Sequence, residues 1–283
     1  MTILRIVDTI SALRNTLVPW RDQRIALVPT MGNLHAGHLA LVRHAHTLAD
    51  RVVVSIFVNP LQFGPTEDYA AYPRTLDSDS LKLVEVGVDL LFTPLPQEIY
   101  PQGQKGLTIV TVPGLSDLLC GAIRPGHFIG VATVVTLLLN LVQPQVALFG
   151  EKDFQQILVI RRLVADLHLP VEVVACPTVR ELDGLAMSSR NGYLSEEERR
   201  QAPTLYRALC GMRDGLATGI NDYERLEKAC WAELAASGFK PEYCTVRRAV
   251  DLALPDKGDY QLAILAAARL GQTRLIDNIQ VIR

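Results

Sequence analysis

The sequence has few cysteines, and their spacing excludes most roles that need paired thiols. Neither a C-x-x-C motif nor a grouping typical of metal ligands is present. An odd number of widely spaced cysteines is typical of small buried thiols in a reducing compartment and not of a disulfide framework. These residues are Cys120, Cys176, Cys210, Cys230 and Cys244.

The sequence also lacks a hydrophobic run long enough to span a membrane. The longest apolar stretch, Val131 to Val142, covers about a dozen residues and contains two threonines and an asparagine, whereas a membrane helix needs roughly 20 apolar residues. This stretch therefore predicts a buried helix. The N-terminal residues form an amphipathic pattern instead of a signal peptide. We expect a cytoplasmic protein with no membrane partner.

A surplus of one charge is missing as well. The 28 lysines and arginines nearly balance the 30 aspartates and glutamates, and no basic cluster is interleaved with aromatic residues. This composition argues against an extended nucleic-acid surface. The 283 residues are 49% hydrophobic, without repeats or low-complexity linkers. They are sufficient for one large or two small globular domains.

Predicted strands and helices alternate over roughly the first two-thirds of the chain. The strand candidates are residues 25–28, 52–58, 90–92, 108–112, 146–149 and 171–175. The helical patterns are residues 39–49, 76–86, 115–120, 128–142 and 154–167. Such alternation predicts an α/β fold with a Rossmann-like, doubly wound parallel sheet, in which ligands bind at the carboxyl ends of the strands.

The pattern changes near residue 178, and we predict a first domain at residues 1–178 and a smaller α+β domain at residues 179–283. Ser195 to Glu198 form a capping box that opens a charged helix running to about Gly215. A second amphipathic helix and three strands follow. Their ranges are 221–236 for the helix and 243–246, 261–267 and 273–279 for the strands.

The segment from Ile25 to His38 is the most informative part of the sequence. It reads as a buried strand, a turn with Gly32 and Gly37, and the start of a helix. If the helix has begun by His35, both imidazoles project on one side. The amides of a helix start favour an anion, so the two rings could donate hydrogen bonds to phosphate. A four-residue H-x-G-H match is only moderately specific, and a helix-terminal residue beside a core residue is the structural alternative.

Polar residues follow other predicted strands at the same expected edge of the sheet. They are Asn59, Gln62, Arg124, His127, Gly150 to Asp153, Gln155, Gln156 and Met187 to Arg190. Each could have a structural role alone: Gln62 as a loop amide, Lys152 in a surface ion pair, Ser188 in a turn. Together they fit phosphoryl or nucleotidyl transfer, which needs cations and donors from several loops.

Six motifs in order resemble the pantothenate synthetase family, also called pantoate–β-alanine ligases. They are Pro29–His38, Val58–Phe63, Tyr72–Thr75, Arg124–Phe128, Gly150–Gln156 and Ser188–Tyr193. The resemblance extends to Arg269–Asn278. It implies a cytoplasmic homodimer of the nucleotidyltransferase superfamily that forms pantothenate from pantoate, β-alanine and ATP, with AMP and pyrophosphate as products.

The resemblance also implies roles for individual residues. His35, His38, Lys152 and Arg190 would be catalytic, and Gln62, Gln156 and Asn59 would bind pantoate or β-alanine. Mg²⁺ is expected mainly on the ATP phosphates, with Asp79 as a candidate support or, alternatively, an exposed helix residue. The ATP site would comprise Met31, Gly32, Asn33, Leu34, His35, Ala36, Gly37, His38, Gly150, Glu151, Lys152, Asp153, Val179, Met187, Ser188, Ser189 and Arg190.

Two positions depart from the common pattern. The segment Met187 to Arg190 has no lysine, so that Arg190 and Lys152 would supply the cations, and Ala36 stands where relatives commonly carry an acidic residue. Gly184 and Gly192 bracket the segment, which suits a loop that changes conformation. We therefore expect the smaller domain to close over ATP as a lid.

Three other functions stay open from the residues alone. Another nucleotidyltransferase of this fold would use the two histidines but gives no reason for Gln62 and Gln156. An activity like that of aminoacyl-tRNA synthetases would need an anticodon-binding domain and a basic face, and neither is visible. A non-catalytic nucleotide sensor would keep the turn while losing the cations and glutamines, yet these are present.

Overall fold

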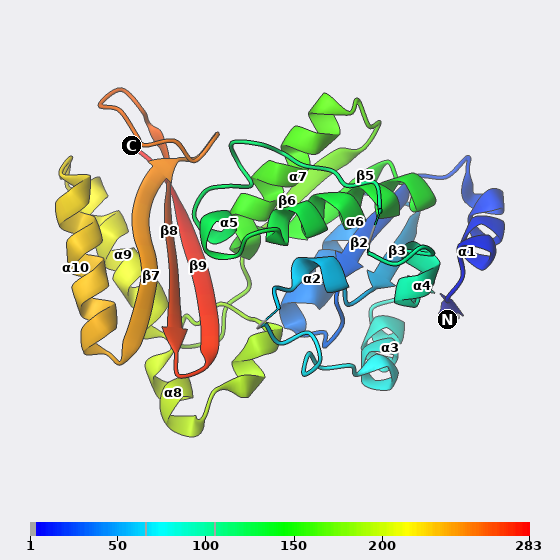
Figure 1. Ribbon diagram of the computed structural model, residues 1–283, viewed down its shortest axis with the longest axis horizontal. Coiled ribbons are helices and arrows are strands. Elements are labelled where there is room, and N and C mark those ends of the chain that lie inside the picture. Colours follow the sequence, from blue (N-terminus) through cyan, green and yellow to red (C-terminus); the bar gives the residue numbers. More distant parts are fainter. Residues whose placement is uncertain (1–3, 66, 105) are drawn as a thin grey trace.

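The computed structural model describes residues 4–65, 67–104 and 106–283 and contains two sheets (Figure 1). The larger sheet is parallel, with strand order β1-β4-β3-β2-β5-β6, and the smaller is antiparallel, with order β7-β8-β9. This architecture confirms the predicted Rossmann-like sheet with a smaller C-terminal unit. The strands are β1 Arg5–Val7, β2 Ile25–Thr30, β3 Arg51–Ile56, β4 Leu90–Phe92, β5 Val146–Gly150, β6 Glu172–Cys176, β7 Phe239–Arg248, β8 Gln261–Leu270 and β9 Thr273–Ile282.

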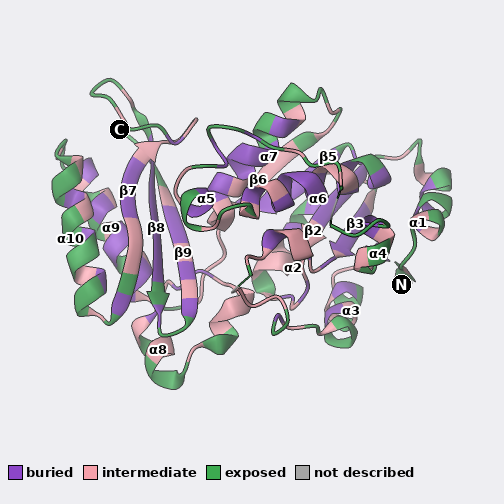
Figure 2. Ribbon diagram, in the orientation of Figure 1, coloured by how far each residue is buried: buried purple, intermediate pink, exposed green. Residues whose placement is uncertain are grey.

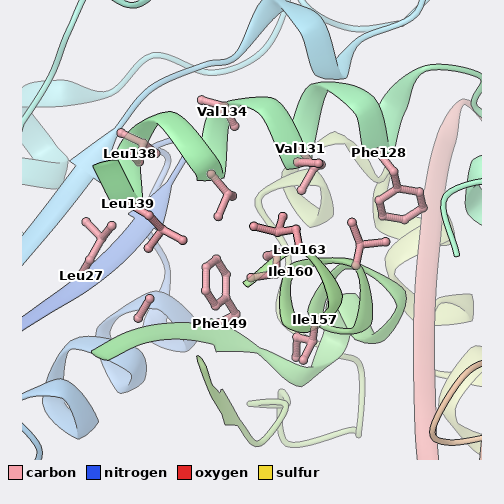
Figure 3. Close-up of a cluster of buried hydrophobic side chains, with 14 of the residues drawn as sticks. Leu27, Phe128, Val131, Val134, Leu138, Leu139, Phe149, Ile157, Ile160 and Leu163 are labelled. Atoms are coloured by element: carbon pink, nitrogen blue, oxygen red, sulfur yellow. The ribbon is translucent and has the colours of Figure 1, made fainter. Parts of the chain in front are cut away.

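Helices cover both faces of the large sheet because successive strand residues point to opposite sides. Leu27 and Phe149 pack with α6 and α7 on one face (Figure 3), and α1 belongs to the same cluster. Val28 and Leu148 pack with α2 and α3 on the other face. The α-helices are α1 Ile10–Leu17, α2 Ala36–Ala45, α3 Leu76–Glu85, α4 Pro96–Ile99, α5 Cys120–Ile123, α6 His127–Val142, α7 Phe154–Asp166, α8 Glu196–Gln201, α9 Thr204–Ala217 and α10 Tyr223–Ala236. The 3₁₀ turns are η1 Val18–Trp20, η2 Pro60–Gln62, η3 Glu151–Asp153 and η4 Ser189–Tyr193.

The strands of the large sheet are buried along most of their length, as their purple colour in Figure 2 shows. This burial agrees with their continuous apolar runs, because a parallel sheet is covered by helices on both faces. Within the described ranges, no helix combines the length and apolar character that crossing a membrane requires.

Several predicted elements differ from the structure. Residues 108–112 form no strand, since the amide of Val110 donates to Thr133 Oγ1 at 3.0 Å instead of to a neighbouring strand. Residues 115–119 form turns and not a helix, and Leu119 has a positive φ of 44° directly before α5, which begins at Cys120. The predicted helix from residue 196 to 215 is divided into α8 and α9 at Pro203, which has no amide hydrogen to donate. Strand β1 was not predicted.

The small sheet connects the two units through its apolar faces. One face packs on α9 and α10, and the other contributes Tyr243, Leu265 and Ile276 to the same hydrophobic cluster as α6 and α7. In Figure 1 this sheet stands between α9 and α10 and the rest of the molecule. The predicted domain boundary at residue 178 falls directly after β6 and stays a prediction.

The strand order reverses between β2 and β5. From β2 the chain builds outward through β3 to β4, and from β5 it builds in the opposite direction to β6. The two central strands pair at Ala26–Val146 and Leu27–Ala147, and both continue beyond these pairs. Ligands of doubly wound sheets bind where the strand order reverses. The histidine turn after β2 and the Lys152 turn after β5 both lie at this point.

Candidate active site

The two motif histidines lie against each other at the start of α2. His35 is the N-cap residue, so the helix begins one residue later than a helical His35 would require, and the ring centroids are 4.0 Å apart. His35 Nδ1 accepts from the Gly37 amide at 3.2 Å, and His38 Nδ1 accepts from the His35 amide at 3.3 Å. Because both Nδ1 atoms accept, each neutral ring carries its proton on Nε2. Both rings therefore offer an Nε2–H donor.

The surroundings keep both imidazoles uncharged. Burial lowers the pKa of His35 to about 3, helped by the repulsion that a protonated His35 would experience from the His38 ring and from Lys152. Burial and the charge of Lys152 lower the pKa of His38 to about 4. At neutral pH the two side chains are thus neutral hydrogen-bond donors beside a cation.

Gly37 is required by the contact between the cap and the helix. A Cβ atom at this position would lie 2.9 Å from Nδ1 and Cε1 of the His35 ring, closer than such atoms approach in proteins. The side chain of His35 could then not fold back onto the Gly37 amide. This glycine therefore permits the imidazole cap.

The Asp79 carboxylate has a structural role that the sequence did not reveal. Oδ2 accepts from the Asn33 amide at 2.8 Å and from Thr75 Oγ1 at 3.0 Å, and Oδ1 accepts from the Leu34 amide at 2.8 Å. The Asp79 side chain is fully buried, so the alternative that Asp79 is an exposed helix residue is wrong. Both carboxylate oxygens accept hydrogen bonds that hold the motif turn, and this is the role that the structure gives Asp79. Across the described ranges, no group of three or more His, Cys, Asp or Glu residues could hold a metal ion.

The turn that carries Lys152 is held from the opposite end of the chain. Asn278 of β9 donates through Nδ2 to the carbonyl oxygens of Glu151 at 2.8 Å and Lys152 at 3.0 Å. The charge of Lys152 lowers the pKa of both motif histidines, and its side chain lines the same hollow as Asn278. Sequence reasoning missed Asn278 because a single asparagine within a strand carries no motif signal.

The segment Met187 to Arg190 contacts the motif turn directly. Asn33 Nδ2 donates to the carbonyl oxygen of Ser189 at 3.2 Å, and Ser189 Oγ donates to the carbonyl oxygen of Asn33 at 3.0 Å. The Met187 amide donates to the carbonyl oxygen of Val179 at 3.0 Å. Residues 179 and 187–189 are therefore brought to the edge of the sheet that carries the histidines.

Arg190 is paired with a carboxylate at this edge. Its Nε and Nη2 atoms donate to the two oxygens of Asp68 at 3.2 and 3.1 Å, and its guanidinium lies 5.7 Å from the centre of the Tyr72 ring. An arginine held by a carboxylate on both donors must leave it before it can bind phosphate in the same way. Asp68 was not among the residues predicted from the sequence.

Asn59 orients the side chain of Gln62 from within the protein interior. The Asn59 side chain is fully buried, and its Nδ2 donates to Gln62 Oε1 at 2.9 Å and to the carbonyl oxygen of Gly130 at 3.0 Å. Asn59 Oδ1 accepts from the Tyr100 hydroxyl at 2.8 Å. A Cβ atom on Gly130 would lie 2.3 Å from the carbonyl oxygen of Leu61, so only glycine lets α6 approach this turn. Asn59 is therefore buried against Gln62 and is not exposed to a ligand.

Arg124 and His127, which had no predicted role, hold the backbone of Gln62. His127 Nδ1 donates to the carbonyl oxygen of Gln62 at 2.8 Å, and Arg124 Nη1 donates to His127 Nε2 at 3.1 Å. The Arg124 guanidinium also binds both oxygens of Glu67 at 2.7 and 2.6 Å. Burial, together with the charge of Arg124, lowers the pKa of His127 to about 4. These groups fix the loop that presents Gln62.

Lys152 and Gln156 face one hollow, which also borders the small sheet. Its lining includes Arg124 from the segment before α6, His127 from the first turn of α6 and Arg274 from β9. The neighbouring Gln155 is buried and donates to the carbonyl oxygens of two turn residues, so it has a structural role. The structure thus brings Gln156 beside Lys152, while Gln62 joins this region through its own backbone contact with His127.

The comparisons with known proteins identify the family of the chain. The model of the pantoate–β-alanine ligase family matches residues 5–280. The chain belongs to this family. It is 59% identical to the pantothenate synthetase of Thioalkalivibrio sulfidiphilus over 280 residues, which cover 98% of each chain.

Solved structures of pantoate–β-alanine ligases share the fold. The pantothenate synthetase from Thermus thermophilus is 49% identical, with a TM-score of 0.93 over 99% of this chain and 100% of the other. The ligase from Francisella tularensis, complexed with β-γ ATP and β-alanine, is 35% identical, with a TM-score of 0.81 over 98% and 97% of the two chains. Membership of the pantoate–β-alanine ligase family favours a ligase over the three alternatives that the sequence left open.

Proposed function

We propose that the chain catalyses the ATP-dependent condensation of pantoate with β-alanine, giving pantothenate, AMP and pyrophosphate. The observation that carries this proposal is the pair of neutral histidines that follows β2 at the point where the strand order reverses, with Lys152 following the neighbouring strand β5, in a member of the pantoate–β-alanine ligase family. The relative from F. tularensis, complexed with β-γ ATP and β-alanine, supports the choice of substrates.

The first step is the formation of pantoyl adenylate. A carboxylate is a poor electrophile, so one pantoate oxygen attacks the α-phosphorus of ATP in line and pyrophosphate leaves. No enzyme nucleophile is needed, and catalysis consists of positioning and charge stabilisation. The Nε2–H groups of His35 and His38 donate to phosphate oxygens, and Lys152 offsets the developing charge. Magnesium enters with the substrate as its ATP complex.

The second step is the attack of the neutral β-alanine amine on the carbonyl carbon of the adenylate, which releases AMP with the bridging oxygen. Gln62 and Gln156 hold the pantoate hydroxyls, because neutral amides suit an uncharged polar group. Asn59 and His127 keep the Gln62 turn in place. The adenylate must stay enclosed, since water would hydrolyse it.

Enclosure involves the segment from Met187 to Arg190, which we propose exchanges the Asp68 carboxylate for phosphate when ATP binds. Arg190 offers the same two donors to either partner. A movement of the whole C-terminal unit would separate Tyr243 and Leu265 from the cluster that they share with α6 and α7. This shared packing favours closure of the loop over closure of the entire smaller domain as a lid.

An oxygen-transfer experiment tests the proposed reaction. Pantoate with ¹⁸O in its carboxylate should deliver one labelled oxygen to AMP, because the carboxylate oxygen that attacks phosphorus stays with AMP when the amine attacks carbon. Mass spectrometry of the products would detect it, and omission of β-alanine is the control, which should leave the label in the adenylate. Label found only in pyrophosphate or free phosphate, or ADP as the product, would contradict the mechanism.

We also propose a cytoplasmic location and a homodimer. Free thiols at all five cysteines support a reducing compartment. The dimer is carried over from the family resemblance, and no nucleic-acid partner is proposed. Sedimentation equilibrium of the purified chain would measure its mass, and a monomer at micromolar concentration would contradict the proposed dimer.

A further inference from the structure

The C-terminal strand β9 reaches the proposed ATP site through two adjacent buried residues. Asp277 and Asn278 are 3% and 6% exposed, respectively. Successive strand residues point to opposite faces, so Asn278 shares its face with Ile276, which packs in the cluster of the large-sheet unit. The Asn278 amide thus points across the junction of the two units.

The contacts of Asn278 are concentrated on the turn that bears Lys152. One amide nitrogen donates to two successive carbonyl oxygens, those of Glu151 and Lys152, at 2.8 and 3.0 Å. The backbone amide of Asn278 in turn donates to Asp277 Oδ1 at 2.8 Å. Because two carbonyls on one turn share one fixed donor group, rotation of the peptide between them is restricted.

Asp277 anchors the same strand on its other side. Arg180 donates to both carboxylate oxygens, at 2.6 and 3.0 Å, and to the carbonyl oxygen of Gly184 at 3.1 Å. The Arg180 guanidinium is stacked on the Tyr206 ring, 3.7 Å from its centre. The position of Asn278 is therefore set by a buried ion pair that also holds the segment leading to Met187.

We propose that Asn278 is a positioning residue for Lys152, so that the C-terminal sheet forms part of the ATP site. This inference rests on the proposed role of Lys152 in adenylate formation. The Asn278 amide holds the Lys152 backbone, and the ammonium is thereby kept at the phosphates near His35 and His38. Without these hydrogen bonds the turn relaxes, and a displacement of about 1 Å can cost up to a hundredfold in rate.

A double-mutant cycle tests the inference. Asn278→Leu removes the amide at similar size, and Asn278→Asp replaces the donor by an oxygen that repels the two carbonyls. We expect either change to lower the rate of pyrophosphate release in a single turnover by roughly tenfold or more, with the pantoate KM within about twofold. In the Lys152→Ala background, the same changes should alter the rate by less than about twofold. Two variants keep the test valid if one fails to fold.

Gln280→Glu is the matched control, because Gln280 lies two residues further along the same strand face and is exposed. It should leave the rate unchanged. Equal losses from the Asn278 changes in both backgrounds would show a structural role and overturn the inference alone. If Lys152→Ala leaves the rate unchanged, the role of Lys152 and this inference fall together. The ¹⁸O transfer measured on the unaltered chain reports separately on the proposed reaction.

Discussion

Neutral motif histidines predict an unusual pH dependence of adenylate formation. At pH 5.5, a histidine with the ordinary pKa of about 6.5 would be roughly nine-tenths protonated. His38, with its pKa lowered to about 4, would be only about 3% protonated at that pH. Protonation would also put a hydrogen on Nδ1, where the amide of His35 already donates. The pKa shift is downward, so the active neutral form persists as the pH falls and is lost only near pH 4.

The assay compares the protein with its His38→Gln variant. Glutamine retains an amide donor but does not titrate, and the ATP phosphates titrate identically with both proteins. The kcat/KM value for ATP is measured from pyrophosphate release between pH 5.5 and 8. The value for the unaltered protein divided by the value for the variant therefore reports the pH dependence of the His38 imidazole alone. An amide donor that is imperfectly placed costs up to roughly a hundredfold in rate, but this cost is the same at every pH. We therefore expect the ratio to stay constant within about twofold.

Two outcomes would refute the reasoning. A tenfold fall of the ratio toward pH 5.5, with a midpoint near 6.5, would mean that His38 titrates normally. A rise of the ratio over the same range would mean that the imidazolium is the active form. A parallel series with His35→Gln tests the other ring, whose pKa is lowered to about 3.

Two further predictions concern the pantoate residues and the loop. Gln62→Ala and Gln156→Ala should each raise the pantoate KM by about tenfold, through the loss of a substrate hydrogen bond, and the ATP KM by less; steady-state kinetics with equal effects on both substrates would place these glutamines elsewhere. Amide hydrogen exchange across residues 180–195 should slow when an ATP analogue and pantoate bind, because Arg190 then holds phosphate. Unchanged protection, together with near-normal activity of Arg190→Ala, would remove the basis for loop closure.

The sequence by itself predicted the features that depend on local patterns. The apolar runs of β2 and β5 and the alternation of helices with strands determine which segments are buried, because side-chain periodicity follows from backbone geometry. The strand ends in turn place Lys152 and the motif histidines at one edge. Local pattern failed at residues 108–112, whose alternation resembles a strand but whose backbone finds a side-chain partner in α6.

Only the tertiary structure decided what each polar group does at that edge. Asp79 supports the motif turn, Arg190 is held by Asp68, and Asn278 holds a turn 126 residues earlier in the chain. Each role depends on which donor meets which acceptor after distant segments have packed. A hydrogen bond requires its partners within a few tenths of an ångström, and the sequence order of the residues contains no such distance.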